Sequence, residues 1–213
     1  MEYRRPAEIE RRSMELIDEE LARRGLVLDQ TLAPVIRRVI HASADFDFAE
    51  QMTFTEGAVE HGVRSLLRGT TIVTDTNMAL AGISKPGLKK LGGKALCFMA
   101  DADVAEQAEK QETTRAVISV RKASEIAPGC IYAVGNAPTA LFELIRQMEQ
   151  GFRPALLIGV PVGFVNVVEA KKALLAYCED RRIPAILAMG RKGGSTIAAA
   201  ICNALIYQAL SKS

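Results

Sequence analysis

Acid–base chemistry near neutral pH depends above all on histidine, and the sequence contains only His41 and His61. Apolar residues from Leu32 to Ile40 recur at helical spacing, and at about 100° per residue His41 points nearly opposite that apolar face. Two interpretations of His41 remain open: a solvent-facing side chain at a helix end, or part of a cleft or subunit interface. The helix end would favour the protonated imidazole, whereas Arg37 and Arg38 would oppose it. His61 lies away from the apolar stripe of its own helix, so we interpret it as a surface residue.

Three glycine-containing segments could bind anions, because each lies between an apolar run and a helical pattern. They read GNAPT (residues 135–139), PVGF (161–164) and GRKGGS (190–195). Parallel strands would bring them to the carboxyl edge of one sheet, where each helix start offers free N–H groups. Arg191 and Lys192 add positive charge. We expect a site for a ligand with several anionic groups, and the alternative of ordinary tight turns stays open.

The familiar catalytic motifs do not fit. GRKGGS lacks the spacing of a phosphate-binding loop, no GxGxxG follows the first predicted strand, and no GxSxG occurs. Ser195 and Thr139 have no evident histidine and acid to form a triad, so we expect them to cap a helix or bond a ligand. His41 is then the main candidate for proton transfer. One acid–base residue without a nucleophile favours isomerisation over hydrolysis.

Short apolar runs alternate with helical patterns along the chain, and three successive strand–loop–helix units end it. Such units form parallel strands joined by right-handed crossovers, with helices on both faces. We predict a single α/β domain over residues 1–213, a three-layer αβα fold with a largely parallel central sheet. Asn166 and Glu169 resemble a capping box. The predicted strands are 70–75, 94–100, 116–120, 131–134, 155–160 and 185–189, and the predicted helices are 6–24, 31–42, 55–67, 101–111 and 139–150, with two more beginning at 166 and 195.

The composition is that of an ordinary globular protein, with 49% hydrophobic and 24% charged residues in a chain of 213. The net charge of +2 requires neither a nucleic-acid nor a membrane partner. No apolar run is long enough to span a bilayer, and the N-terminus lacks a signal-peptide core, so we expect a cytoplasmic location. Four widely spaced cysteines without a CxxC pair favour reduced thiols over a disulfide or zinc site.

The motifs together resemble those of one enzyme family. GNAPTALF (135–142), PVGFV (from Pro161, with Glu169 and Lys171 downstream) and GRKGGS are similar to segments of the precorrin-8X methylmutases, also called cobalt-precorrin-8 methylmutases. Upstream, RRVIHAS around His41, TDTNMALAGI (74–83) and ERRS ending at Ser13 resemble the family in the same order. The resemblance covers essentially the whole chain.

The resemblance implies an isomerase that moves a methyl group between neighbouring ring carbons of a precorrin-8-type tetrapyrrole, giving hydrogenobyrinate or cobyrinate in cobalamin biosynthesis. It assigns proton transfer to His41, needs neither methyl donor nor cofactor, and leaves any cobalt to be carried by the substrate. It also implies a homodimer, which would explain why His41 faces away from its own core. The family commonly has serine where this chain has Ala170, which puts one hydrogen bond in doubt.

The residues expected to bind the polycarboxylate substrate come from these motifs and strand ends. The resemblance places Ser13 and Arg115 near the pigment, although Ser13 falls on an apolar helical stripe, where a hydroxyl usually bonds back to its own helix. A non-catalytic tetrapyrrole or polyanion carrier and a phosphate-ligand transferase remain alternative functions. The expected set is Ser13, Arg37, Arg38, Thr76, Asn77, Met78, Arg115, Gly135, Asn136, Thr139, Gly163, Phe164, Val165, Arg191, Gly193 and Gly194.

Overall fold

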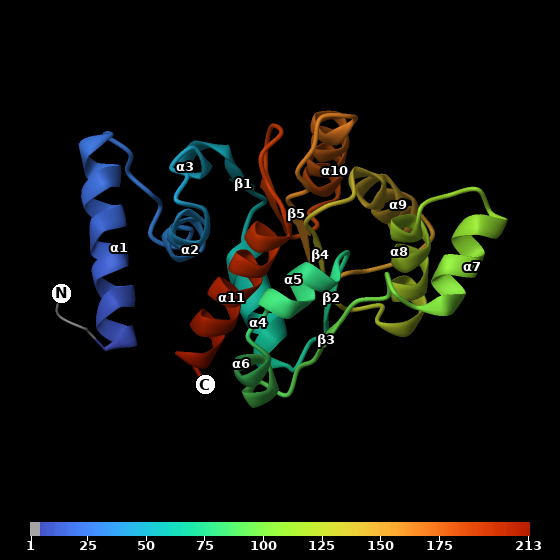
Figure 1. Ribbon diagram of the computed structural model, residues 1–213, viewed down its shortest axis with the longest axis horizontal. Coiled ribbons are helices and arrows are strands. Elements are labelled where there is room, and N and C mark those ends of the chain that lie inside the picture. The colour runs from blue at the N-terminus through green and yellow to red at the C-terminus, as the bar shows by residue number, and fades with distance from the viewer. Residues whose placement is uncertain (1–4) are drawn as a thin grey trace.

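The computed structural model describes residues 5–213 and contains one six-stranded sheet in the order β1-β6-β5-β4-β2-β3 (Figure 1). Neighbouring strands run parallel, with Ile72 opposite Ile131 and Ile158 opposite Ile186, except that β1 runs antiparallel to β6 at one edge. The strands are β1 (Met52–Phe54), β2 (Ile72–Thr74), β3 (Ala95–Leu96), β4 (Ile131–Val134), β5 (Leu156–Gly159) and β6 (Ala185–Ala188).

Helices cover both faces of the sheet. Ile131 and Ala133 of β4 belong to a core formed with α2, α4 and α11, whereas Tyr132 on the opposite face belongs to a core formed with α8, α9 and α10. Apolar residues on both faces are typical of a sheet buried between two helical layers, so the predicted three-layer αβα class is confirmed. The helices within residues 5–213 are α1 (Pro6–Arg23), α2 (Ala33–Ser43), α3 (Phe48–Gln51), α4 (Ala58–Leu67), α5 (Asn77–Gly82), α6 (Lys85–Lys90), α7 (Ala102–Lys110), α8 (Arg115–Ile126), α9 (Pro138–Glu149), α10 (Val167–Arg181) and α11 (Ser195–Leu210).

Helix α11 packs against α2, α4 and α5 and is apolar on nearly all sides, as expected for a helix with neighbours around it. Its alanines allow close approach: a Cβ added to Gly82 of α5 would lie 2.8 Å from the Cβ of Ala199. The start of α11 is therefore fixed against the sheet and against α5. Figure 1 shows α1 at one end of the molecule, beyond α2, and α7 at the opposite end.

The strand predicted at 116–120 is wrong, because these residues lie within α8. The run is short and apolar, and periodicity over so few residues does not separate a strand from a buried helix. The cap decides the outcome: the hydroxyl of Thr114 accepts a hydrogen bond from the N–H of Val117 at 3.3 Å. Ala116, Val120 and Ala123 are then buried at helical spacing.

Other boundaries also differ from the predictions. The sequence pattern missed β1, and the helix predicted from residue 55 begins at Ala58, because Thr55 extends the pairing of β1 by donating its N–H to the carbonyl of Ala185. The capping box predicted for Asn166 and Glu169 does not form, because Asn166 has a left-handed backbone (φ 57°) and its side chain makes no capping hydrogen bond. The segment after β2 forms α5 and α6, which were not predicted.

All four cysteines are free, and Cys130, Cys178 and Cys202 are buried. Among the helices of residues 5–213, none combines the length and apolar character needed to cross a bilayer.

Candidate active site

The turn between β4 and α9 is bound to a buried carboxylate at the end of β2. Asp75 is completely buried, and its Oδ1 accepts a hydrogen bond from the N–H of Gly135 at 2.8 Å. Its Oδ2 accepts two more, from the N–H groups of Asn136 at 2.8 Å and Ala137 at 2.9 Å. Burial raises the pKa of Asp75, and the three N–H groups oppose that shift. The prediction that this turn offers free N–H groups to a ligand is therefore wrong, because the chain's own carboxylate takes them.

The same turn packs directly against the start of α11. Gly135 has no room for a side chain, since a Cβ there would lie 2.7 Å from the Cα of Ser195. The hydroxyls of Thr76 and Ser195 are hydrogen-bonded at 2.7 Å, and Oγ1 of Thr76 also accepts the N–H of Ala79 as the cap of α5. Gly135 belongs to the set of residues expected to bind substrate. In the structure it lets two loops of the protein meet.

The loop before α11 is also joined to the loop after β5. The N–H of Gly194 donates to the carbonyl of Val160 at 2.8 Å, and the N–H of Gly163 donates to the carbonyl of Arg191 at 3.2 Å. A Cβ at Gly193 would collide with the carbonyl oxygen of Val160. The three glycine loops thus lie together at the carboxyl edge of the sheet, as the prediction of parallel strands required.

A buried lysine fixes the loop between β6 and α11 through its carbonyl groups. Lys171 of α10 is completely buried, and its Nζ donates hydrogen bonds to the carbonyl oxygens of Gly190 at 2.9 Å and Lys192 at 2.8 Å. Burial lowers the pKa of Lys171 to about 8. This role could not be predicted from the sequence, because both partners lie about twenty positions further along the chain.

Lys192 is not free to bind a ligand. Its Nζ forms ion pairs with Asp45 and Asp47, each at 2.6 Å, and these raise the pKa of Lys192. The prediction that Lys192 adds positive charge to the ligand site is therefore wrong. Two aspartates that had no assigned role connect the segment after α2 to the loop before α11, while Arg191 stays exposed.

His41 is exposed near the C-terminal end of α2. The helix ends at Ala44, whose left-handed backbone (φ 54°) turns the chain toward Asp45. Because Asp45 is paired with Lys192, the end of α2 lies beside the loop that leads into α11. The histidine therefore belongs to the same end of the molecule as the glycine loops. His61 is exposed as well, as predicted.

Three of the residues expected to bind substrate connect α1 with α2 or bond within α1. Arg37 pairs with Asp18 at 2.5 Å, and Arg38 pairs with Glu10 at 2.7 Å. The hydroxyl of Ser13 donates to the carbonyl of Ile9 at 2.8 Å, which is the back-bonded arrangement weighed for it from the sequence. The guanidinium of Arg38 also stacks on Tyr207, with its Cζ 4.9 Å from the centre of the ring.

Arg115 and Thr139 come together through two helix starts. Arg115 is the first residue of α8 and is exposed. The hydroxyl of Thr139 in α9 lies 3.1 Å from that of Thr114, the cap of α8, so either can donate. Although the strand expected after Arg115 does not form, the arginine still lies near the turn at 135–137.

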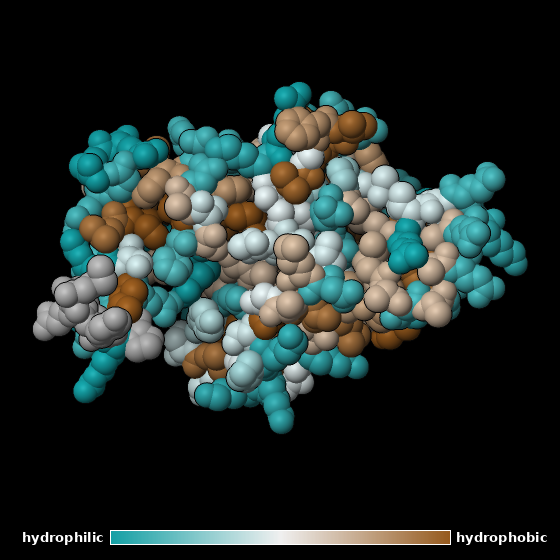
Figure 2. All heavy atoms as spheres, viewed as in Figure 1, coloured by the Kyte–Doolittle hydropathy of each residue, from teal (hydrophilic) through white to brown (hydrophobic). Residues whose placement is uncertain are grey.

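Apolar side chains are exposed around the same loops. Figure 2 shows hydrophobic residues on the surface beside the start of α10. Phe164 is 81% exposed and Val165 78%, and the guanidinium of Arg191 lies 5.7 Å from the centre of the Phe164 ring. Met78 of α5 is 70% exposed, and Asn77 beside it is also exposed. A flat apolar ligand or a second protein surface would cover such side chains.

Ala170, where the family commonly has serine, is completely buried in α10. It packs among the apolar residues between α10 and the sheet. The missing hydroxyl therefore falls in the core of this chain.

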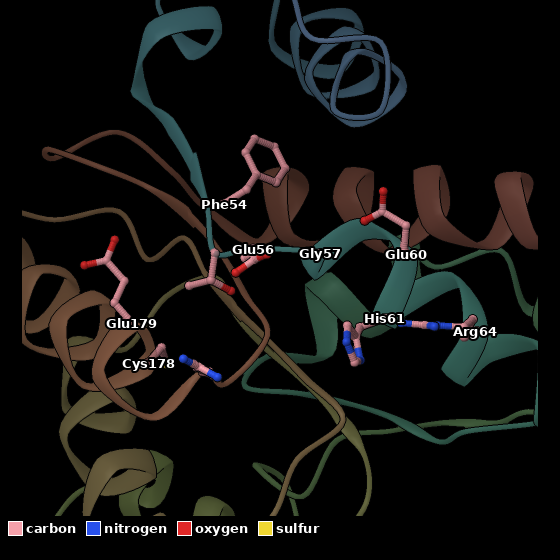
Figure 3. A pocket seen from close by; sticks show the side chains of 10 residues that line it. Phe54, Glu56, Gly57, Glu60, His61, Arg64, Cys178 and Glu179 are labelled. Carbon is pink, nitrogen blue, oxygen red and sulfur yellow. The ribbon is translucent and has the colours of Figure 1, made fainter.

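A pocket of about 680 Å³ lies at the opposite edge of the sheet and contains none of the expected site residues (Figure 3). It is lined by the end of β1, the start of α4 and the end of α10, next to the amino end of β6. Its polar side chains include Glu56, His61, Arg64 and Glu179. These residues are far in the topology from the glycine loops, which favours the carboxyl edge as the candidate site.

Comparison with solved structures gives the class of the protein. A structure from Thermus thermophilus, described as a precorrin-8x methyl mutase, matches with a TM-score of 0.86 and 38% identity, covering 96% of this chain and 98% of that one. The chain thus has the fold of a methylmutase, an enzyme of the isomerase class.

Comparison of sequences gives the family. The family model for precorrin-8X methylmutase matches residues 8–208. A cobalt-precorrin-8 methylmutase from Priestia megaterium is 43% identical over 201 residues, which are 94% of this chain and 87% of the relative. A precorrin-8X methylmutase from Pseudomonas aeruginosa is 35% identical over 198 residues, 92% and 93% of the two chains. The chain belongs to the precorrin-8X methylmutase family.

The buried ammonium of Lys171 predicts a pH-dependent stability. Its pKa is about 8 in the folded protein against a reference value of 10.5, so between these pH values the unfolded chain binds a proton that the folded chain has lost. The free energy of unfolding should therefore rise with pH in this window, by up to about 1.4 kcal/mol per pH unit, and should be insensitive to this group below pH 8. Urea unfolding of the wild type and of Lys171→Met, measured from pH 7 to 10, tests the difference between the two proteins.

Lys172→Met provides the control, because Lys172 is the exposed neighbour. Burial raises the pKa of the Cys130, Cys178 and Cys202 thiols to about 12, which lowers stability above pH 9 equally in all three proteins. A wild-type-minus-K171M difference that stays flat from pH 8 to 10 would contradict the prediction.

Proposed function

We propose that this enzyme shifts a methyl group between neighbouring ring carbons of precorrin-8X or its cobalt form, as an isomerase of cobalamin biosynthesis. Family membership over nearly the whole chain supports the reaction class. The observation that carries the assignment of the site is the meeting of three glycine loops, an exposed histidine and exposed apolar residues at one edge of the sheet. The product would be hydrogenobyrinate or cobyrinate.

The substrate's acetate and propionate arms need donors that the protein has not already used. Lys192, Arg37 and Arg38 are in ion pairs among the described residues, and the salt bridges there include neither Arg115 nor Arg191. At the start of α11, the N–H groups of Ser195, Thr196 and Ile197 have no acceptor within residues 5–213. We assign the carboxylate arms to these two arginines and to this helix start.

The macrocycle itself is large, flat and apolar at its centre. The exposed side chains of Phe164, Val165 and Met78 offer it an apolar surface beside the polar groups. Glycines at 163 and 194 leave the backbone open beside that surface. Such a division, with apolar contacts to the ring and donors around its rim, fits a polycarboxylate tetrapyrrole.

We assign proton transfer to the imidazole of His41. Protonation of the conjugated ring would make the migrating bond easier to break and to re-form, and the proton would return to the imidazole as the product forms. The methyl group stays within the same molecule throughout, so the step needs no methyl donor. A well-placed acid–base group contributes roughly 100- to 10,000-fold to a rate. We propose no resident cofactor, because any cobalt would enter as part of the substrate.

A homodimer would complete this open face. His41 is exposed, and α1 leaves Ile9 54% and Leu16 49% exposed. In a dimer, a partner could cover the apolar residues and supply the second wall of the cleft. The cytoplasmic location stays a prediction.

The dimer proposal predicts that activity depends on association. Light scattering should give about twice the mass of one chain, and dilution that yields monomer should reduce activity per chain in parallel. A strictly monomeric protein with full activity would exclude a shared site.

Replacement of His41 separates an isomerase from a carrier. His41→Ala should still bind the tetrapyrrole but lose turnover by roughly 100- to 10,000-fold, because only proton transfer is removed. Conversion of substrate to product is followed by visible absorption, and retained pigment is measured after gel filtration. His61→Ala is the matched control, since it removes the other histidine in the distant pocket. Wild-type turnover in His41→Ala would favour the carrier.

Loss of Arg115 or Arg191 should weaken binding of the carboxylate arms. Each alanine variant should raise KM or the product's Kd by about tenfold, because a charge-assisted hydrogen bond is worth roughly 1.5–3 kcal/mol. Added salt should reduce the difference from wild type. Arg64→Ala, an exposed arginine at the opposite edge, is the control. Equal Kd values for all four proteins would remove these arginines from the site.

A further inference from the structure

Asp75 is a buried carboxylate that serves the backbone of another segment. It is completely buried at the end of β2, and its own N–H donates to the carbonyl of Ala133, which extends the pairing with β4. Its two oxygens accept three N–H groups, those of residues 135, 136 and 137, at 2.8 to 2.9 Å. A carboxylate that accepts three such bonds is best satisfied in its ionised form. No salt bridge of residues 5–213 includes it, so amide dipoles are its partners.

These bonds determine where the start of α9 lies. The first helical residue, Pro138, has no N–H, and the three N–H groups before it all point to Asp75. The internal carboxylate thus occupies the position at this helix start that an external anion would take. Without it, the turn would present three unsatisfied donors, and Gly135 would lose its fixed approach to Ser195.

The residue after Asp75 acts on the neighbouring loop. Thr76 is hydrogen-bonded to Ser195 at the start of α11, while the exposed Asn77 and Met78 follow it. Two consecutive residues therefore connect β2 with two of the three glycine loops. Asn136 is exposed, and its own N–H and that of Ala137 both donate to this carboxylate. The backbone of Asn136 is therefore fixed by Asp75.

We infer that Asp75 is a positioning residue for substrate binding: its carboxylate fixes the turn at 135–137, so that Asn136 and the start of α9 form one wall of the macrocycle site. This inference rests on the proposed function. Asp75 itself does not contact the ligand, because it is completely buried beneath the turn. Its removal should therefore affect the binding of substrate more than the chemical step at His41.

The test uses removal and replacement of the carboxylate. Asp75→Ala leaves a space lined by three N–H groups that formate, a small carboxylate, can fill. KM should rise about tenfold with kcat within about threefold of wild type, and sodium formate should lower KM again, whereas sodium chloride at equal ionic strength should not. Asp75→Asn should show the raised KM without rescue, since its amide NH2 would face a backbone N–H.

Another buried acidic residue, Glu143 of α9, provides the control. Glu143 is 6% exposed and pairs with Arg121 at 2.7 Å, so Glu143→Gln should destabilise the protein while leaving KM unchanged and formate without effect. Thermal unfolding of all variants separates general loss of stability from the change in KM. If Asp75→Ala does not fold, Asp75→Asn carries the same KM comparison.

The outcomes distinguish failure of the proposed function from failure of the role inferred for Asp75. A wild-type protein that neither binds nor converts the tetrapyrrole overturns the proposed function, and this inference with it. Normal turnover by the wild type with an unchanged KM in both Asp75 variants overturns the inference alone. An equal rise in KM in Glu143→Gln also overturns it, because the effect would then follow from lost stability.

Discussion

The hydrogen bonds between the Asp75 carboxylate and three consecutive backbone N–H groups determine how the carboxyl edge of the sheet is built. A helix start and the turn before it attract an anion, and in nucleotide-binding α/β folds that anion is a phosphate of the ligand. Here the anion follows β2, the neighbouring parallel strand. The bond network converts a turn with glycine and proline into a fixed surface, and the next residue, Thr76, extends that order to the start of α11.

A buried cation completes the arrangement on the other side of the loops. Lys171 donates to two carbonyl groups of the loop before α11, whereas Asp75 accepts N–H groups from the loop before α9. Each charge is removed from water, which is unfavourable by itself, and each is compensated by backbone groups that would otherwise be unpaired. The two loops therefore reach one conformation before any ligand binds.

The strand–loop–helix units of the last third could be predicted because their strands are continuously apolar and their loops contain glycine. Val134, Gly159 and Ala188 end strands where the pattern indicated, within one residue. The pattern failed at 116–120, where four apolar residues and a serine fit a strand or a buried helix and the cap at Thr114 decides. It also missed β1, which is three residues long and pairs with β6 more than 130 positions away.

Prediction of the site was limited in a different way. The order of strands and helices predicted that the loops meet at one edge of the sheet. It did not indicate which N–H groups and cationic side chains are already paired with other groups of the protein. Lys192 looked available, but it is paired with Asp45 and Asp47, which lie 147 and 145 positions earlier in the chain. A helical pattern relates residues only three or four positions apart. Partners so distant in sequence become visible only when the topology is known.

The division of charges has a consequence for how the enzyme can recognise its substrate. Asp75, Lys171 and Lys192 are used to order the loops, so the proposed site would bind substrate through groups that order nothing else. Arg191 lies against the exposed Phe164, so one loop offers a cation and an apolar face together. A macrocycle with a flat centre and charged arms needs that combination at its rim. In the proposed function, the ordered edge would serve as a platform, and selectivity would come from the exposed side chains that it positions.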